Sequence, residues 1–202
     1  MTSTEARPQR LIIGISGASG AVYGVRLLEL LRDSPIETHL VVSKSALITV
    51  AHETGLSWSD LKPMASVCYS NQDIGAAIAS GSYKTLGMIV APCSMRSMSE
   101  IASGVTSTLL TRAADVILKE RRRLALMVRE TPLHRNHLRT MTELTELGAI
   151  IAPPVPAFYA LPKTLDEMVD HSLGRVLDLF DIELGIVRRW RDDNPDAGHA
   201  TP

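Results

Sequence analysis

Residues 14–24 of this 202-residue chain read GISGASGAVYG. The apolar run 11–15 leads into this stretch, and leucines recur at helical spacing over 22–32 just after it. A short apolar run, a turn of small residues and an amphipathic segment are typical of a parallel strand that continues into a covering helix. The stretch therefore predicts an α/β fold with a tight turn at the carboxyl end of its first strand.

The same alternation continues along the chain. Further apolar runs without strict polar alternation indicate strands covered on both faces, at 39–42, 88–91, 124–128 and 149–152. Helical periodicity follows them at 45–54, 95–102, 107–121, 134–147 and 165–180. This order predicts a three-layer α/β/α, Rossmann-like (flavodoxin-like) parallel sheet in a single domain. Residues 56–85 are less regular, and there we expect a short strand near Val67 and a helix over 74–79.

Composition limits the possible functions. We expect one domain over 10–190 with disordered, polar ends at 1–9 and 191–202. A net charge of −1 gives no electrostatic reason to expect nucleic acid or a membrane surface as partner. The chain has two cysteines, no cluster of metal-ligand residues and no apolar leader, so we expect a cytoplasmic protein without a metal that handles small molecules.

The small residues of the turn predict a ligand site. In an open parallel sheet, ligands bind beyond the carboxyl ends of the strands, where Ser16 and Ser19 would add hydroxyl donors to a helix N-terminus that favours phosphate. The spacing matches neither G-x-G-x-x-G nor a P-loop, and a turn without a ligand stays open as the alternative. Ser43, and Ser94 with Ser97, follow two other strands; each could be only a helix cap, but three such loops on one edge favour a site.

A series of motifs at consistent spacing then resembles a known family. The motifs are GISGASGAVYG at 14–24, SK at 43–44, SGS at 80–82, PCS at 92–94, LLTRAADVILKERR at 109–122, VRETPLH at 128–134 and PPVPAFY at 153–159. From about residue 10 to 190 the chain resembles the flavin prenyltransferases of UbiX type, partner proteins of ubiquinone-pathway and aromatic-acid decarboxylases. The related flavin-dependent cysteine decarboxylases carry a Pro-x-Met-Asn-x-x-Met segment where this chain has PPVPAFY, which argues against that branch.

The resemblance implies a reaction. The dimethylallyl group of dimethylallyl phosphate would join N5 and C6 of reduced FMN without a metal, giving prenylated FMN. This product would be the cofactor of a separate UbiD-type decarboxylase. Family members form homo-oligomers, often dodecamers, whose active sites are shared between subunits. Whether the donor is the monophosphate or the pyrophosphate, and which pathway receives the product, stay open.

The resemblance also implies binding residues. Those expected to line the FMN site are Gly17, Ala18, Ser19, Ser43, Ser94, Met95, Arg96, Ser97 and Arg129. Those expected to bind the donor phosphate are Lys119, Tyr159, Arg175 and Arg129. Fixed positive charge is needed there because no metal stabilises the leaving phosphate. Two alternatives stay open: Lys119 lies in the basic stretch LKERRR, most of which we expect to be solvated, and Arg129 could form only a surface ion pair with Glu130.

The expected catalytic set is Glu130, Lys119, Glu53 and Ser19. Glu130 is the main acid/base candidate, because closing the new ring requires loss of a proton. The departing phosphate could also act as the base. Glu53, at the end of the second predicted helix, could instead be a solvated helix-end carboxylate. We expect Cys93 to be a small buried residue rather than a catalytic thiol.

Two other functions compete with the transferase. An FMN-binding carrier or accessory subunit of a decarboxylase would use the same glycine and serine loops. It would not need the phosphate-binding and acid/base residues Lys119, Glu130, Tyr159 and Arg175, so these discriminate the two. Flavodoxin-like electron transfer is disfavoured because the T-x-T-G-x-T loop of flavodoxins is absent.

Overall fold

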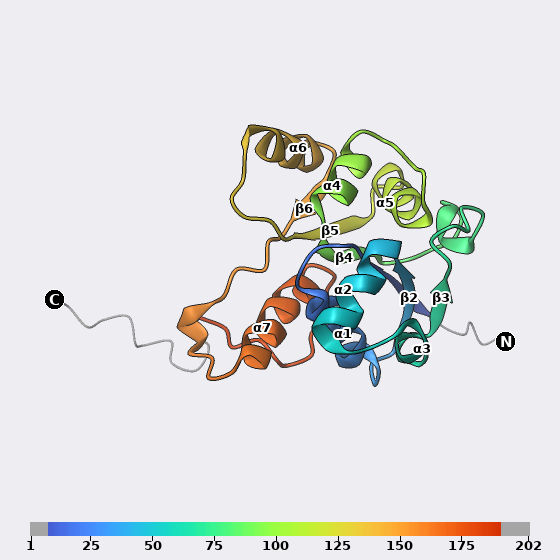
Figure 1. Ribbon diagram of the computed structural model, residues 1–202. Coiled ribbons are helices and arrows are strands. Elements are labelled where there is room, and N and C mark those ends of the chain that lie inside the picture. Colours follow the sequence, from blue (N-terminus) through green and yellow to red (C-terminus); the bar gives the residue numbers. More distant parts are fainter. Residues whose placement is uncertain (1–7, 191–202) are drawn as a thin grey trace, which may run out of the picture. The chain divides into compact units, whose positions relative to one another are not determined.

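The computed structural model describes residues 8–190 (Figure 1). By their internal contacts the residues fall into two compact units, which part between Pro153 and Pro154. The expectation that residues 10–190 form one domain stays a prediction. The expected disordered ends lie outside the described residues, apart from Pro8 and Gln9, and Gln9 already belongs to the first strand.

The first unit is built on a parallel sheet of six strands in the order β3-β2-β1-β4-β5-β6. The strands are β1 (Gln9–Ile15), β2 (Ile36–Val42), β3 (Val67–Tyr69), β4 (Gly87–Cys93), β5 (Arg123–Val128) and β6 (Ala149–Ile151). This is the Rossmann order, in which the direction of winding reverses between β1 and β4. The predicted parallel α/β fold is confirmed, and the reversal opens a crevice at the carboxyl ends of these two strands.

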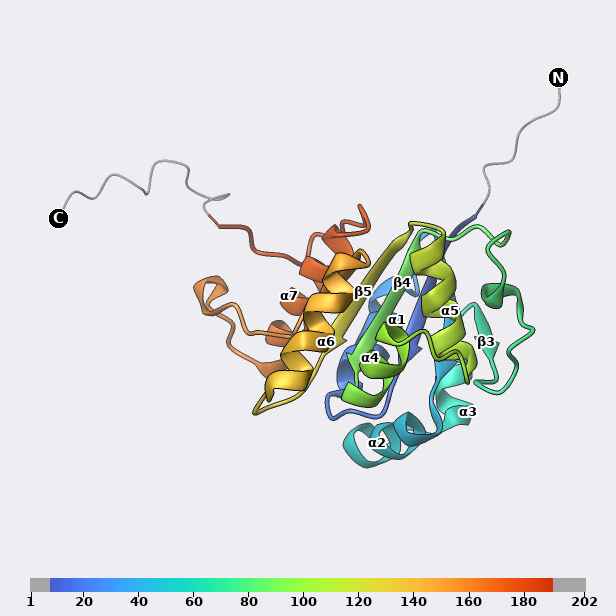
Figure 2. The same ribbon diagram turned by 90° about the horizontal axis from the view of Figure 1, so that it is seen from above.

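Helices cover both faces of the sheet in this unit. The longer ones are α1 (Ala21–Leu31), α2 (Lys44–Thr54), α4 (Met95–Ala102), α5 (Leu109–Lys119) and α6 (Arg135–Glu146), with a short α3 at Trp58–Leu61. Helices α4, α5 and α6 lie together on one face, and α1 lies on the other face, next to α2 (Figures 1 and 2). The sheet with a helix layer on either side is the predicted three-layer arrangement.

One predicted helix does not form. Over 74–79 the structure has only a 3₁₀ turn at Ala77–Ala79. Just before it, the side chain of Asp73 accepts a hydrogen bond from the amide of Gly75, and its carbonyl accepts one from the amide of Ala76. Such local bonds of an aspartate compete with helix formation. The strand expected near Val67 is confirmed as β3.

The core of the first unit explains why the strands lack alternation. Leu11, Ile12 and Ile13 of β1 are at most 1% exposed, and every residue of β4 is buried. Burying one such aliphatic side chain contributes about 1.5–3 kcal/mol. Helix α1 packs closely on this layer because Gly24 has no side chain: a Cβ there would overlap the carbonyl oxygen of Ala91.

The second unit contains a 3₁₀ turn at Phe158–Ala160 and helix α7 (Leu165–Asp178). The helix begins at Thr164, whose side chain accepts a hydrogen bond from the amide of Glu167. After α7 the described chain continues to Trp190 without a further helix or strand. Across residues 8–190, no helix combines the length and apolarity that crossing a bilayer requires.

Candidate active site

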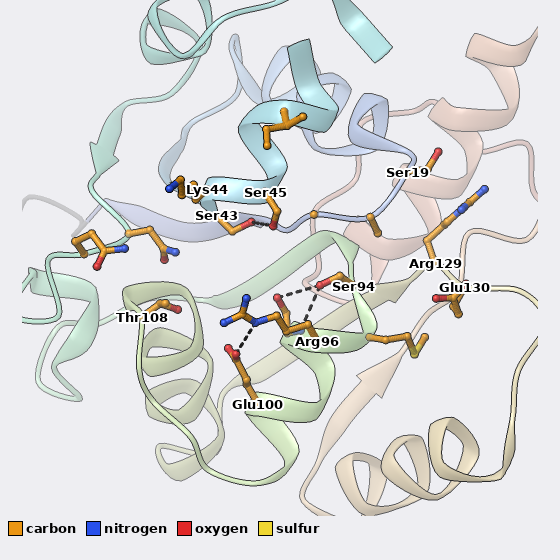
Figure 3. A pocket seen from close by; sticks show the side chains of 17 residues that line it. Ser19, Ser43, Lys44, Ser45, Ser94, Arg96, Glu100, Thr108, Arg129 and Glu130 are labelled. Atoms are coloured by element: carbon orange, nitrogen blue, oxygen red, sulfur yellow. Dashed lines mark hydrogen bonds and ion pairs between the residues drawn. The ribbon is translucent and has the colours of Figure 1, made fainter. Parts of the chain in front are cut away.

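A cavity of about 770 Å³ opens at the carboxyl end of the sheet, within the first unit (Figure 3). The loops that follow β1, β2, β3, β4 and β5 all contribute to its wall. The structure brings together here every residue predicted for the FMN site, together with Glu130: Gly17, Ala18, Ser19, Ser43, Ser94, Met95, Arg96, Ser97 and Arg129. The cavity therefore lies at the switch point of the sheet, where open α/β sheets bind ligands.

Two of the predicted serines are both helix caps and cavity residues. The hydroxyl oxygen of Ser43 accepts a hydrogen bond from the amide of Ala46 at 3.1 Å and so begins α2. Ser94 begins α4 in the same way by accepting from the amide of Ser97 at 3.2 Å. The capping interpretation and the ligand interpretation are therefore compatible, because each cap directs a helix N-terminus, with its partial positive charge, toward the cavity.

Ser16 has a different role from the one predicted. Its side chain is fully buried, donates a hydrogen bond to the carbonyl of Pro92 at 2.9 Å and accepts one from the amide of Ser94 at 2.7 Å. The prediction of a hydroxyl donor to a ligand is wrong for this residue. Ser16 instead ties the loop after β1 to the loop after β4, where these neighbouring strands diverge.

Two glycines of the opening stretch meet different requirements. A Cβ on Gly17 would overlap the side chain of Ser45, so Gly17 allows the turn after β1 to approach the first turn of α2. Gly20 precedes α1 with a φ of 98°, a left-handed conformation that glycine adopts readily. The small residues are thus required by the backbone conformation and packing of the turn, whether or not a ligand binds there.

Glu53 completes the N-terminus of α1. Its carboxylate accepts hydrogen bonds from the amides of Gly20 at 2.9 Å and Ala21 at 2.8 Å, and also bonds the side chain of Ser19. Partial burial alone would raise the pKa of Glu53, but these hydrogen bonds and the charge of Arg129 outweigh it and hold the pKa below its usual value. Glu53 is therefore an ionised cap next to the cavity rather than a merely solvated carboxylate.

Positive charge is placed at both ends of the cavity. Lys44 and Arg129 lie on opposite sides in Figure 3, and neither forms an ion pair within the described chain. Arg96, between them, is paired with Glu100 at 2.9 Å. Glu130 accepts a hydrogen bond from the amide of Thr131 at 2.9 Å, and within residues 8–190 it forms no ion pair with Arg129, the alternative considered from the sequence. Two cations thus remain available to anionic groups.

Comparison with known proteins identifies the family of this chain. The flavoprotein family model matches residues 1–189. The flavin prenyltransferase UbiX of Salmonella typhimurium is 56% identical over 186 residues, covering 91% of this chain and 98% of that protein. UbiX of Thauera aromatica is 54% identical over 181 residues, covering 90% of this chain and 93% of that protein. This chain belongs to the flavin prenyltransferase family.

Solved structures agree with this assignment. AnUbiX (PadA1), crystallised with FMN and dimethylallyl pyrophosphate, has a TM-score of 0.89 at 46% identity over 91% of this chain and 98% of that one. A dodecameric FMN-dependent UbiX-like decarboxylase from Escherichia coli O157:H7 has a TM-score of 0.88 at 47% identity, over 90% of this chain and 99% of that one.

Lys119 lies away from the cavity in its own chain. Helix α5 begins beside Thr108, which lines the cavity, and ends at Lys119. Eleven residues span roughly 16 Å of helix, so Lys119 lies at the opposite end of α5. There its ammonium pairs with Glu120. Within one subunit the structure does not bring Lys119 together with the other predicted residues.

Tyr159 and Arg175 belong to the second unit. The ring of Tyr159 packs edge-on against His171 and Trp190, with ring centroids 5.6 and 5.5 Å apart. Arg175, in the last turn of α7, donates a hydrogen bond to Asp178 at 2.7 Å. Their roles in binding a donor phosphate stay predictions.

Several cavity residues have no counterpart in the sequence prediction. They are Lys44, Ser45, Ile48, Asn71, Gln72, Glu100 and Thr108. Lys44 and Ser45 adjoin Ser43, so the SK motif was a usable signal for them. Asn71 and Gln72 come from the irregular region 56–85, where their position directly after β3 is the only indication.

Cys93 is buried, as expected. It ends β4 with no exposed surface, and this burial raises the pKa of its thiol to about 12. A thiol with so high a pKa is a poor nucleophile at neutral pH. Among the described residues, no group of three or more His, Cys, Asp or Glu side chains is arranged to hold a metal ion.

Proposed function

We propose that this protein transfers the dimethylallyl group of dimethylallyl phosphate to N5 and C6 of reduced FMN, and that the prenylated FMN serves a separate UbiD-type decarboxylase. The observation that carries the proposal is the cavity at the switch point, with capped helix ends in its wall and, at two ends, Lys44 and Arg129, which form no ion pair within residues 8–190. A relative crystallised with FMN and dimethylallyl pyrophosphate supports the same pair of substrates.

The cavity suits FMN as a substrate. Its volume of about 770 Å³ is within the usual range for ligand sites and leaves room for a small second substrate. The N-termini of α2 and α4 and the hydroxyls around them are suited to polar and phosphate groups. Because only one phosphate has to be bound on the flavin, we expect FMN to bind more tightly than riboflavin or FAD.

The reaction needs both charge stabilisation and proton transfer. The bond between the allylic carbon and the phosphate oxygen breaks, its electron pair leaves on the phosphate, and a new bond forms to flavin N5. A second bond then forms to C6. The flavin loses one proton from N5 and one from C6, and the former alkene gains one. A cation beside the phosphate and a carboxylate beside the flavin would supply these functions.

The residues are assigned accordingly. Arg129 would contact both FMN and the donor phosphate, and Lys119, Tyr159 and Arg175 would complete the phosphate site. Glu130 would take up the proton lost in ring closure, since its carboxylate lies in the cavity wall. Glu53, hydrogen-bonded to Ser19, would be the second group in proton transfer.

The position of Lys119 supports a shared site. An α5 residue that is remote from its own cavity can reach a donor phosphate only in the cavity of another subunit. We therefore infer a homo-oligomer in which a neighbour supplies Lys119, in line with the dodecamer described for the Escherichia coli O157:H7 relative. We further infer that the enzyme works in the cytoplasm and passes its product to a decarboxylase.

The test is anaerobic incubation with reduced FMN and dimethylallyl phosphate, followed by mass and absorbance measurements on the released flavin. We expect FMN plus one prenyl unit. A parallel incubation with dimethylallyl pyrophosphate determines which donor is used. Tight FMN binding with unmodified flavin from both donors would contradict the transferase and favour the carrier function.

A further inference from the structure

In the second unit, Tyr159 depends on side-chain contacts for its position. It lies in the single 3₁₀ turn Phe158–Ala160, whose flanking side chains Phe158 and Leu161 are 71% and 69% exposed. The turn therefore contributes few buried apolar groups of its own. Because an exposed turn of this kind moves readily, whatever the Tyr159 ring packs against determines where its hydroxyl lies.

His171 provides one of these contacts from a rigid position. It lies in the middle of α7, is 6% exposed, and is one of few polar side chains buried in the described chain. Its ring meets the ring of Tyr159 at 83° with centroids 5.6 Å apart, the edge-to-face arrangement that aromatic pairs prefer.

The same imidazole binds the segment 183–190, which we call the return segment. Nε2 of His171 is 3.2 Å from the carbonyl oxygen of Arg188. Since a carbonyl oxygen only accepts hydrogen bonds, Nε2 carries a proton and donates it. Trp190, at the end of the return segment, packs on Tyr159. His171 thus contacts Tyr159 directly and also holds the segment that carries its other aromatic neighbour.

Other contacts also hold the return segment against α7. Arg189 donates two hydrogen bonds to Asp178, at 3.0 and 3.1 Å. A Cβ on Gly174 would overlap Val187, so the segment lies directly on α7. The return segment is therefore fixed on α7 at several points, and His171 provides one of them.

Helical spacing connects His171 to Arg175. Residues four apart lie on one face of a helix, one turn from each other. His171 therefore holds Tyr159 on the face of α7 that also presents Arg175. Both of these residues are assigned to the donor phosphate.

We propose that His171 is a positioning residue that sets the separation of Tyr159 and Arg175, and so the affinity for dimethylallyl phosphate. This rests on the proposed function, which assigns both residues to the donor. His171 itself would touch neither substrate. Its two contacts, the ring edge and the Nε2 hydrogen bond, can be removed separately.

Three variants of the full chain separate the contacts. His171→Phe keeps the aromatic contact and loses the hydrogen bond, His171→Gln keeps an N–H donor and loses the ring, and His171→Ala loses both. With reduced FMN saturating, we expect His171→Ala to raise KM for dimethylallyl phosphate roughly tenfold with kcat nearly unchanged. Each of the other two variants recovers part of that loss. FMN affinity stays at the wild-type value.

Ser172→Ala is the matched control. Ser172 is also buried on α7, but its hydroxyl bonds only the carbonyl of Met168 in the same helix. We expect its donor KM to equal that of the wild type. A wild-type donor KM in His171→Ala, or an equal rise in Ser172→Ala, would overturn the proposal.

A spectroscopic measurement keeps the inference separate from the proposed function. The Nε2 proton of His171 should give a slowly exchanging imidazole signal in ¹⁵N NMR spectra, and the loss of this hydrogen bond in His171→Phe should shift the indole N–H signal of Trp190, which lies at the end of the return segment. If the wild type fails to prenylate FMN, the proposed function is wrong. If that imidazole signal is absent from active wild-type protein, His171 does not hold the return segment.

Discussion

Glu53 combines a structural and a chemical role in one carboxylate. It replaces the side-chain cap that Gly20 cannot provide at the start of α1, and it also bonds Ser19 in the cavity wall. A carboxylate at a helix N-terminus is favoured by the helix dipole. The same hydrogen bonds that stabilise the helix lower the pKa of Glu53 and keep it ionised next to the cavity wall.

The pH dependence of stability follows from this lowered pKa. A carboxyl group with a folded-state pKa below its unfolded value stabilises the fold above the unfolded pKa and loses that effect as pH falls through the folded pKa. We expect Glu53→Gln to lower Tm at pH 7, with the difference from wild type shrinking as pH falls below about 4 and through the lowered pKa of Glu53. Thermal unfolding across this range measures it, with Glu146→Gln on α6 as control. A constant difference down to pH 3 would contradict the ionised cap.

The proposed role of Glu130 as a base can be tested by substitution. Glu130→Gln keeps the shape and the hydrogen bond from Thr131 but removes the base. We expect the bond to N5 to form and the closure onto C6 to slow by roughly 10²–10⁴-fold, so that a singly linked adduct accumulates. The adduct and the closed product have the same mass, so time-resolved absorbance spectra of the flavin would distinguish them. Ring closure at the wild-type rate would assign the proton to the phosphate or to Glu53.

At the scale of elements, the cavity depends on how closely β1 and α2 approach. Gly17 faces Ser45 with no space for a Cβ. Any side chain there has to push the start of α2 away from the turn after β1. The distance between the turn after β1 and the first turn of α2 therefore sets the shape of the cavity.

Gly17→Ala tests this approach. We expect it to destabilise the protein by about 1–3 kcal/mol, as overpacking does, and to weaken FMN binding. Removing the facing side chain in Gly17→Ala/Ser45→Gly should recover part of the loss, with Ser45→Gly alone as control. Denaturant unfolding and FMN titration provide both quantities. Independent, additive effects of the two substitutions would show that the contact does not shape the cavity.

Edge strand β3 is tied to its neighbours by polar side chains as well as by backbone pairing with β2. His39, on β2, is fully buried, and its ring nitrogens lie 2.9 Å from the hydroxyl of Tyr69 and 3.0 Å from Glu37. Beyond the strand, Asn71 accepts hydrogen bonds from the first amides of α5. These contacts hold the loop that places Asn71 and Gln72 in the cavity wall.

At the scale of the whole molecule, both Lys119 and the second unit favour association. Large apolar side chains of the second unit are exposed in the single chain, among them Val155, Phe158 and Leu165. Apolar side chains left exposed in one chain are covered when another chain binds over them. The remote position of Lys119 requires a neighbour for the proposed reaction.

Mixed oligomers test the shared site. Lys119→Ala and Glu130→Gln should each be nearly inactive alone, but subunits of both kinds in one oligomer should form some sites with both residues intact. We expect co-expression of the two variants to restore part of the activity. Light scattering after size exclusion verifies that the oligomers form. A monomer with full activity, or mixed oligomers without recovery, would contradict a shared site.

Much of the fold follows from local pattern. Apolar runs and helical periodicity predicted the sheet and its main helices, because covering both faces of a strand leaves a readable signature in its residues. The exception is local too. The helix expected over 74–79 is replaced by turns around Asp73.

For the candidate site, the sequence determined which loops and motifs form it, since residues after parallel strands gather at one edge of the sheet. Only the tertiary structure decided which groups each of these side chains contacts. Ser16 and Ser19 look alike in sequence, yet Ser16 is buried between β1 and β4 while Ser19 faces Glu53 and the cavity. Glu53 likewise reaches α1 from the far end of α2, a contact between residues more than thirty positions apart. Such contacts depend on packing between elements, which no local pattern encodes.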